Sequence, residues 1–491
     1  MKEKADLLRR HGSHIRRPLV SVIIPAQNEA KSIGRVVKEA KKVSKRTEVI
    51  VVCNGTSDAT AQIARRAGAK VLLYRQALGH DVGRAVGARL AKGLVLLFLD
   101  ADFSVPSPVL KKYCKAVRNG CDVALNAYSG YTTRTFIHST SEAKRLLNRL
   151  LGRSDLAGSS LTAVPHAMTR RAAELIGYPE LSVPPKAQVK AIMAGLQVEK
   201  AVHFNVAKLN RVRTRNKMGN YVEQLILADH AEAIEYWLGK SRSEGWQNIE
   251  KISDFHSHQL LEKVPGNAIK PELSLVFLYQ DALHRERIES EIQKAQAVYE
   301  DIAAAEIWFA LSDLRQPYAA RAAAAEAAEG QLILFVDGSL PFQYQTLIPL
   351  LAACRCGADI ALSSVRPSGS MAKLGTVPMA VRYLNRMMQR RQLGFASLLH
   401  VPHAMTANAV KRISPVYLGI PPLAHSFAVL QGMKIEVARQ TPAGYPRFSA
   451  WEDQAAIQAH LDALDWLQHK YGARLFFQDT SRRRDAVSSS E

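Results

Sequence analysis

Short apolar runs alternate with helix-like segments through the first half of the chain. The runs cover residues 19–24, 49–53, 70–74 and 94–99, and helix-like segments such as 33–44 and 59–67 separate them. This alternation predicts an α/β fold with a mostly parallel sheet covered by helices. Such sheets bind ligands at the carboxyl ends of their strands, which is where the polar motifs of this half fall.

Much of the pattern occurs twice. The hexapeptide Val164–Thr169 returns as Val401–Thr406, an offset of 401 − 164 = 237 residues, and the same ungapped offset relates Arg84 to Arg321 and Gly195 to Gly432. We therefore predict two tandem domains that share one fold. The predicted bounds are a basic N-terminal extension at 1–17, a first domain at 18–238, a linker at 239–270, a second domain at 271–478 and a disordered tail at 479–491.

Polar residues follow three of the predicted strands. The first strand runs into Pro25–Glu29, the second into Asn54–Asp58, and the buried run at 94–99 ends in Asp100-Ala-Asp102. Two carboxylates one residue apart at the end of a buried strand suit a divalent cation, Mg²⁺ or Mn²⁺, that neutralises a nucleotide diphosphate. Either strand-end turn taken alone is also typical of a simple helix cap.

The order of these motifs, with Gly79–Arg84 between them, resembles glycosyltransferase family 2 over residues 18–237. The resemblance implies a GT-A fold for both domains and a nucleotide-sugar donor, a UDP-sugar, in the first. It also implies a metal site at Asp100 and Asp102 and a set of donor-binding residues: Pro25, Ala26, Asn28, Glu29, Asn54, Asp58, Arg84 and Asp100. The family commonly has an acid where this chain has Asn54, and an amide still hydrogen-bonds a base edge.

Downstream segments carry the acceptor-side candidates. Val164–Arg171 resembles the family's acceptor segment, which implies that Arg170, Arg171 and His166 hold an anionic acceptor; a solvated basic pair and a structural histidine are the alternatives. Residues 201–213 resemble the distal segment of glucosyl-3-phosphoglycerate synthases, in which a histidine completes the metal shell. The aligned position is Leu209, and His203 lies six residues earlier as the candidate ligand.

The catalytic base has no obvious candidate at the expected place. Inverting family members carry an acid after the acceptor segment, where this chain reads Ser182–Gln188 without a carboxylate. Glu180 is the nearby candidate. A retaining mechanism, in which the donor phosphate helps to accept the proton, stays open.

The second half keeps the strands but not the motifs. Asp100 returns as Asp337, whereas Asp102 becomes Ser339 and the basic pair becomes Ala407-Asn408. Loss of a metal carboxylate and of the basic pair predicts a catalytically silent second domain.

Charge and composition bear on location. The formal net charge of +22 attracts anionic substrates or lipid headgroups. Met1–Pro18 has no apolar signal segment, the longest apolar run is too short to span a bilayer, and five cysteines suit reduced thiols. We expect a cytoplasmic glycosyltransferase that contacts the inner membrane face and an unknown acceptor, and no nucleic-acid partner. A nucleotidyltransferase of similar fold and a non-catalytic envelope-associated scaffold are the alternatives.

Overall fold

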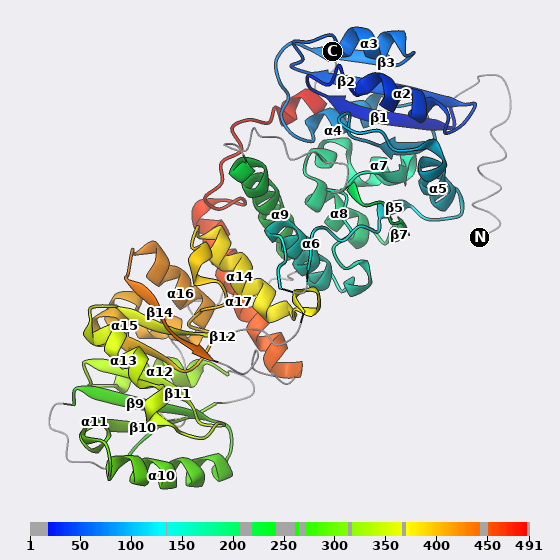
Figure 1. Cartoon of the computed structure of the whole chain (residues 1–491). Helices are drawn as coiled ribbons and strands as arrows, with labels where there is room; N and C mark the ends of the chain where they lie inside the picture. The colour runs from blue at the N-terminus through cyan, green and yellow to red at the C-terminus, as the bar shows by residue number, and fades with distance from the viewer. Residues whose placement is uncertain are drawn as a thin grey trace. The chain divides into compact units, whose positions relative to one another are not determined.

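The computed structural model describes residues 18–133, 135–206, 219–241, 261–264, 271–312, 317–365, 370–441 and 450–488. These residues form two compact units (Figure 1). The first consists of Met1–Gly239 together with Ala473–Glu491, and the second of Lys240–Gly472. The predicted extension at 1–17 lies outside the described residues, as do most of the predicted linker and the last three residues of the chain.

The first unit contains a seven-stranded mixed sheet in the order β3-β2-β1-β4-β6-β5-β7. Its strands are β1 Val20–Ala26, β2 Thr47–Asn54, β3 Lys70–Tyr74, β4 Val95–Phe98, β5 Val123–Asn126, β6 His166–Thr169 and β7 Val198–Val202. Its helices are α2 Ile33–Lys41, α3 Thr60–Arg66, α4 Val82–Leu90, α5 Ser107–Arg118, α6 Ser139–Leu150, α7 Arg170–Ile176, α8 Pro184–Met193 and α9 Gly219–Ser241, with short 3₁₀ turns η1 Ser154–Leu156, η2 Tyr178–Ser182 and η10 Arg484–Val487.

Burial explains why these segments take their structures. The central strand β1 is apolar and buried on both faces, as expected for a strand between two layers of helices. Helix α2 buries Ile33, Val36, Val37 and Ala40, which recur at helical spacing and face the sheet. Burying each such aliphatic side chain stabilises the unit by about 1.5–3 kcal/mol.

Strand direction decides which residues meet. Strand β6 pairs antiparallel with both β4 and β5, while all the other pairs in this sheet are parallel. The carboxyl ends of β1, β2, β3, β4, β5 and β7 therefore lie at one edge of the sheet, here called the carboxyl edge. Only the amino end of β6, at His166, lies at that edge, because His166 pairs with Phe98 and Thr169 with Val95.

The second unit repeats the architecture with a sheet in the order β14-β12-β13-β11-β9-β10-β8. Its strands are β8 Leu261–Lys263, β9 Leu273–Tyr279, β10 Glu306–Leu311, β11 Leu332–Asp337, β12 Ile360–Val365, β13 His403–Thr406 and β14 Ile435–Thr441. Its helices are α10 Ala282–Gln296, α11 Glu300–Ala303, α12 Ala319–Ala327, α13 Ile348–Arg355, α14 Thr376–Met387, α15 Ala407–Ile413, α16 Pro421–Leu430 and α17 Ala450–Tyr471, joined by 3₁₀ turns η6 Tyr344–Thr346, η7 Met371–Lys373, η8 Arg391–Leu393 and η9 Pro415–Gly419.

The offset of 237 residues also relates structural details. Helices α7 and α15 start at Arg170 and Ala407, and the preceding strands both follow a cis proline, Pro165 and Pro402. In the first unit the amide of Gly93 donates to the Ser21 hydroxyl at 2.7 Å, and Gly330 repeats this contact with Ser274 at 2.9 Å. Each unit is thus an α/β fold, as the sequence predicts, and is built on a seven-stranded mixed sheet. One edge differs, because β8 is antiparallel to β10 whereas β3 is parallel to β2.

Two predicted boundaries are wrong. Residues 261–263 were expected in the linker but form β8, which pairs with β10. Residues 479–488 were expected in a disordered tail but pack in the first unit, where Ala486 and Val487 join the hydrophobic core. A segment rich in arginine and serine is typical of a solvated tail. Here, however, Asp229 and Glu232 of the first unit neutralise two of its arginines.

Candidate functional site

The turns after β1 and β2 hold each other at the carboxyl edge. Asn28 adopts a left-handed backbone with φ 55°, and its side-chain oxygen accepts hydrogen bonds from the amide and hydroxyl of Ser57 at 2.8 and 3.2 Å. The carboxylate of Asp58 accepts from the amides of Ala30 at 3.1 Å and Thr60 at 2.9 Å. Although burial opposes it, hydrogen bonding lowers the pKa of Asp58, first through the Thr60 hydroxyl, which also donates to this carboxylate, and then through the two amides. Asn28 and Asp58 therefore fix the shape of the edge.

Asn54 links the end of β2 to the turn Leu78–Asp81 that precedes α4. Its side-chain nitrogen donates to the carbonyl of Gly79 at 3.1 Å, and its oxygen accepts from the amide of Leu78. Gly55 follows with φ +64°, and a Cβ there would meet the backbone of Ala77 at 2.9 Å. The amide group predicted to read a base edge thus holds this turn in the structure. Pro25 and Ala26 lie at the end of β1 in the same edge.

A buried arginine connects two carboxylates at the centre of the edge. Arg84 donates to Asp100 at 2.6 Å and also to Asp81, and the side chains of Arg84 and Asp81 are 6% and 2% exposed. Burial would raise the pKa of Asp81, but Arg84, with His80, Arg482 and His166, lowers it overall. Asp81 and Asp100, in turn, raise the pKa of Arg84 despite its burial. Asp81 has a left-handed φ of 64° and was not predicted, because no spacing rule singles it out.

Asp100 and Asp102 follow β4 and offer carboxylates to a cation. The Asp100 side chain is 34% exposed and keeps one oxygen beyond its contact with Arg84, while Asp102 is exposed and close enough to act on the charge of Arg84. Oxygen ligands of this kind suit Mg²⁺ or Mn²⁺, which one or two carboxylates and substrate phosphates commonly hold. The residues present fit such an ion.

His203 follows β7 at the same edge, where its exposed ring lies 6.1 Å from the ring of Tyr128. Among the described residues, however, no three acidic, histidine or cysteine side chains are grouped closely enough to hold a metal. The structure therefore brings Asp100, Asp102 and His203 to one edge but not into one coordination shell. Leu209 lies outside the described residues.

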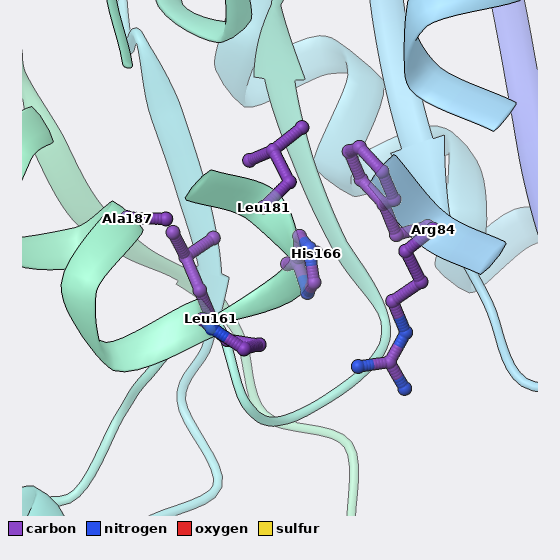
Figure 2. Close-up of a pocket in the computed structure, with 7 residues that line it drawn as sticks. Arg84, Leu161, His166, Leu181 and Ala187 are labelled. Carbon is purple, nitrogen blue, oxygen red and sulfur yellow. The ribbon is translucent and has the colours of Figure 1, made fainter. Parts of the chain in front are cut away.

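Arg84 and His166 contribute to the lining of a small cavity (Figure 2). Figure 2 shows the apolar side chains of Leu161 and Leu181 around His166, with the side chain of Arg84 to one side. The His166 ring stacks on Phe98 with centroids 4.8 Å apart, and its Nδ1 contacts the carbonyl of Ala163 at 2.9 Å. Burial lowers the pKa of His166 to about 4, so the ring is neutral at pH 7. His403 makes a similar but more tilted ring contact with Phe335, with centroids 5.0 Å apart, which favours the structural interpretation over acceptor binding.

The basic pair lies at the opposite edge of the sheet. Arg170 follows the carboxyl end of β6, and its guanidinium donates to the carbonyl of Gly93 at 2.8 and 3.0 Å and to that of Ala91. Arg171, the second residue of α7, is exposed. Because β6 is antiparallel, the pair lies away from the carboxyl edge that holds Asp100, and the acceptor role of Arg170 and Arg171 stays a prediction.

Glu180, the candidate base, is held by two lysines. Its oxygens lie 3.3 Å from Lys186 Nζ and 3.2 Å from Lys190 Nζ. These ion pairs join η2 to α8. They indicate a structural role rather than a free general base.

Two further polar residues serve the carboxyl edge and were missed. Asn126, fully buried at the end of β5, donates to the carbonyls of Val164 at 3.2 Å and Phe204 at 3.0 Å and thereby fixes the loop carrying His203. Burial lowers the pKa of Lys144, on α6, to about 8, and its charge acts on Asp81 and Arg84. A lone asparagine after an apolar strand was the only available signal for the first, and none marked the second.

The second unit arranges its counterparts differently. Arg321 donates to the carbonyls of Leu398 at 2.9 Å and Leu399 at 3.1 Å. Ser339, in place of Asp102, donates through its hydroxyl to Asp337 at 2.6 Å. The cation–carboxylate bridge of the first unit is replaced by contacts to neutral groups.

Residues 21–175 match the family model for Glycosyl transferase family 2, which confirms the resemblance for the first unit. A 4,4'-diaponeurosporenoate glycosyltransferase of Staphylococcus haemolyticus is 38% identical over 89 residues, 17% of this chain and 24% of the relative. An undecaprenyl-phosphate 4-deoxy-4-formamido-L-arabinose transferase of Edwardsiella ictaluri is 29% identical over 145 residues, 28% of this chain and 44% of the relative. The matches span less than half the length of these curated relatives.

Among solved structures, glucosyl-3-phosphoglycerate synthase of Mycobacterium tuberculosis, in complex with Mn²⁺, UDP and phosphoglyceric acid, is similar. It has 18% identity and a TM-score of 0.34, over 47% of this chain and 81% of the other. Separately, no helix among the described residues combines the length and apolarity needed to cross a bilayer.

Proposed function

We propose that the first unit transfers a sugar from a UDP-sugar to an anionic acceptor with the help of Mg²⁺ or Mn²⁺. The observation that carries this proposal is the bridge from Asp81 through Arg84 to Asp100, at the carboxyl edge of a segment that matches family 2. A buried guanidinium fixed between two carboxylates keeps Asp100 in one position beside Asp102. A preorganised, charged edge of this kind stabilises a diphosphate leaving group without costly rearrangement.

The residues have distinct tasks in this proposal. Asp102 and the second oxygen of Asp100 hold the cation, which when bound neutralises the diphosphate that leaves. Asn54 and the backbone at Pro25 and Ala26 face the nucleoside, while Glu29 follows on the same turn. His203, at the same edge, would supply a third ligand to the cation if its imidazole came within reach of it.

An anionic acceptor agrees with two observations. The formal net charge of +22 attracts anions, and curated relatives include transferases named for undecaprenyl phosphate. Free cysteines at all five positions agree with a reducing compartment such as the cytoplasm. The second unit, which has Ser339 in place of Asp102, acts without this chemistry.

Calorimetric titration of the full chain with UDP, with and without Mn²⁺, tests the proposal. We expect Mn²⁺-dependent binding that Asp102→Asn weakens at least about tenfold, a loss of about 1.4 kcal/mol. Asp337→Asn, in the second unit, is the matched control and leaves the affinity unchanged. No Mn²⁺-dependent heat from the wild type would exclude the transferase and leave the scaffold. Release of pyrophosphate rather than UDP from a nucleotide substrate would favour the nucleotidyltransferase.

A further inference from the structure

The last described segment of the chain, Ala473–Ser488, belongs to the first unit although the whole second unit precedes it in sequence. We call this segment the strap. Figure 1 shows its red trace beside α4. Ala486 and Val487 are buried in the core of the first unit, and Arg89 of α4 donates to the carbonyl of Val487.

Arg482 anchors the strap. Its side chain is completely buried and donates to the carboxylate of Asp229 at 2.6 and 3.1 Å, to Asp479 at 2.8 Å and to the carbonyl of Ser182 at 2.8 Å. Asp229 lies on α9 and Ser182 at the end of η2. A buried guanidinium with this many acceptors fixes the local backbone, because moving it would leave a buried charge unpaired.

The backbone of the strap around Arg482 packs directly against the turn Leu78–Asp81. The amide of Arg483 donates to the carbonyl of Leu78 at 2.8 Å. Gly79 has φ +88°, and a Cβ at this position would lie 2.6 Å from the carbonyl oxygen of Ser481 and 2.8 Å from the Cα of Arg482. Only glycine therefore allows the turn and the strap to approach this closely.

The same turn begins the charged bridge of the candidate site. Asn54 holds it from the side of β2, through Leu78 and Gly79. Asp81 ends it and pairs with Arg84, which reaches Asp100. The strap and Asn54 thus both form hydrogen bonds to the turn Leu78–Asp81, and the position of Arg84 depends on this turn.

We propose that the strap is a positioning element of the donor site, in which Arg482 and the amide of Arg483 hold the turn Leu78–Asp81 so that Arg84 stays aimed at Asp100. This inference deepens the proposed function and rests on it for the identity of the donor. Arg482 is a positioning residue, since it acts through the turn rather than by touching the nucleotide.

Two matched pairs of variants in the full chain test the strap. Arg482→Gln is compared with Arg474→Gln. Arg474 shares the partner Asp229 with Arg482 and binds Glu232 as well, but it makes no described contact with the turn Leu78–Asp81. Arg483→Pro removes the amide that binds Leu78, whereas Arg483→Ala keeps it and loses only the side-chain contact with Gln76. The φ of −91° at Arg483 is near the range of proline.

We expect Arg482→Gln and Arg474→Gln to lower the melting temperature by similar amounts, while only Arg482→Gln weakens Mn²⁺-dependent UDP binding, by about three- to tenfold. Arg483→Pro weakens it by a similar factor and Arg483→Ala leaves it unchanged. Equal UDP affinities within the Arg483 pair would overturn the proposal, and this pair decides alone where Arg482→Gln does not fold.

Hydrogen exchange separates the two proposals. Faster exchange over residues 76–84 in Arg483→Pro than in Arg483→Ala is expected with or without nucleotide. If the wild type binds no UDP, the proposed function fails, and equal exchange in the two variants would then overturn the strap as well. Faster exchange with no loss of UDP affinity would show that the strap stabilises the turn without positioning the site.

Discussion

The charged bridge at Arg84 makes a strong prediction about stability, which Arg84→Met tests. Methionine keeps much of the apolar volume but leaves Asp81, whose side chain is 2% exposed, without its main partner. Removing one partner of a buried pair costs about 3–5 kcal/mol. Asp100 adds little to this cost, because it is 34% exposed and water can replace the guanidinium.

The stability that Arg84→Met loses should depend on pH in a defined direction. In the wild type the pKa of Asp81 is lowered, so its contribution to stability is present above the unfolded pKa and is lost as the pH falls below it. In Arg84→Met the carboxylate loses the largest charge that opposes its burial and keeps the smaller effects of His80, Arg482, His166 and Lys144, so the pKa of Asp81 rises. The stability of the variant therefore falls as the pH rises through this new pKa, by up to about 1.4 kcal/mol per pH unit.

Urea titration read by hydrogen exchange on peptides of β1 and β4 follows the first unit separately. We expect the deficit of Arg84→Met to be smaller at pH 5.5 than at pH 7.5, and Arg84→Met combined with Asp81→Asn to recover most of it. Arg321→Met is the matched control, because Arg321 binds backbone carbonyls and its loss leaves no buried carboxylate. A deficit below about 1 kcal/mol, or one that is the same at both pH values, would refute the reasoning.

Three further variants probe other parts of the molecule. Burial lowers the pKa of four histidines in the second unit, and that of His425 to about 4. We therefore expect the second unit to lose stability as the pH drops from 7 to 5, because histidine gains a proton in the unfolded chain over this range but not in the folded one. His425→Gln, which copies Gln188 of the first unit, should reduce that slope by about one proton in urea titrations; an unchanged slope would contradict the assignment. Arg170→Ala should cost about 1–3 kcal/mol in thermal unfolding and leave acceptor kinetics unchanged, and a raised KM for acceptor would restore its predicted role. Asp337→Asn should leave UDP release unchanged, and a loss of turnover would give the second unit a catalytic part.

The sheets could be predicted from the sequence because their strands are short apolar runs with polar ends. Burial on both faces requires such runs, and the edge at Asp100 follows from where they stop. The repeat at an offset of 237 residues likewise predicted a second domain with the fold of the first. The pattern of apolar and polar residues was sufficient to predict those elements whose structure depends only on which residues are buried.

The remaining features depend on partners far away in sequence. The position of Arg170 depends on strand direction, and a four-residue strand such as His166–Thr169 has the same sequence pattern whether it runs parallel or antiparallel to its neighbours. The sequence predicts disorder for the strap because the acidic partners of its arginines are not nearby in sequence. Asp229 and Glu232, which bind these arginines, lie about 250 residues earlier. The pairing of Asp81 with Arg84 depends on a left-handed backbone at Asp81 that no sequence rule demands.

The strap also bears on how the molecule is made. Synthesis proceeds from the N-terminus, and domains generally begin to fold as they emerge from the ribosome. The sheet of the first unit can form early, but Arg482, Ala486 and Val487 are translated only after the whole second unit. A nascent or prematurely terminated chain therefore carries a first unit with an open core at α4 and an unsupported turn at Gly79. The turn Arg484–Val487 thus completes a core whose first strand, Val20–Ala26, is synthesised more than a domain earlier.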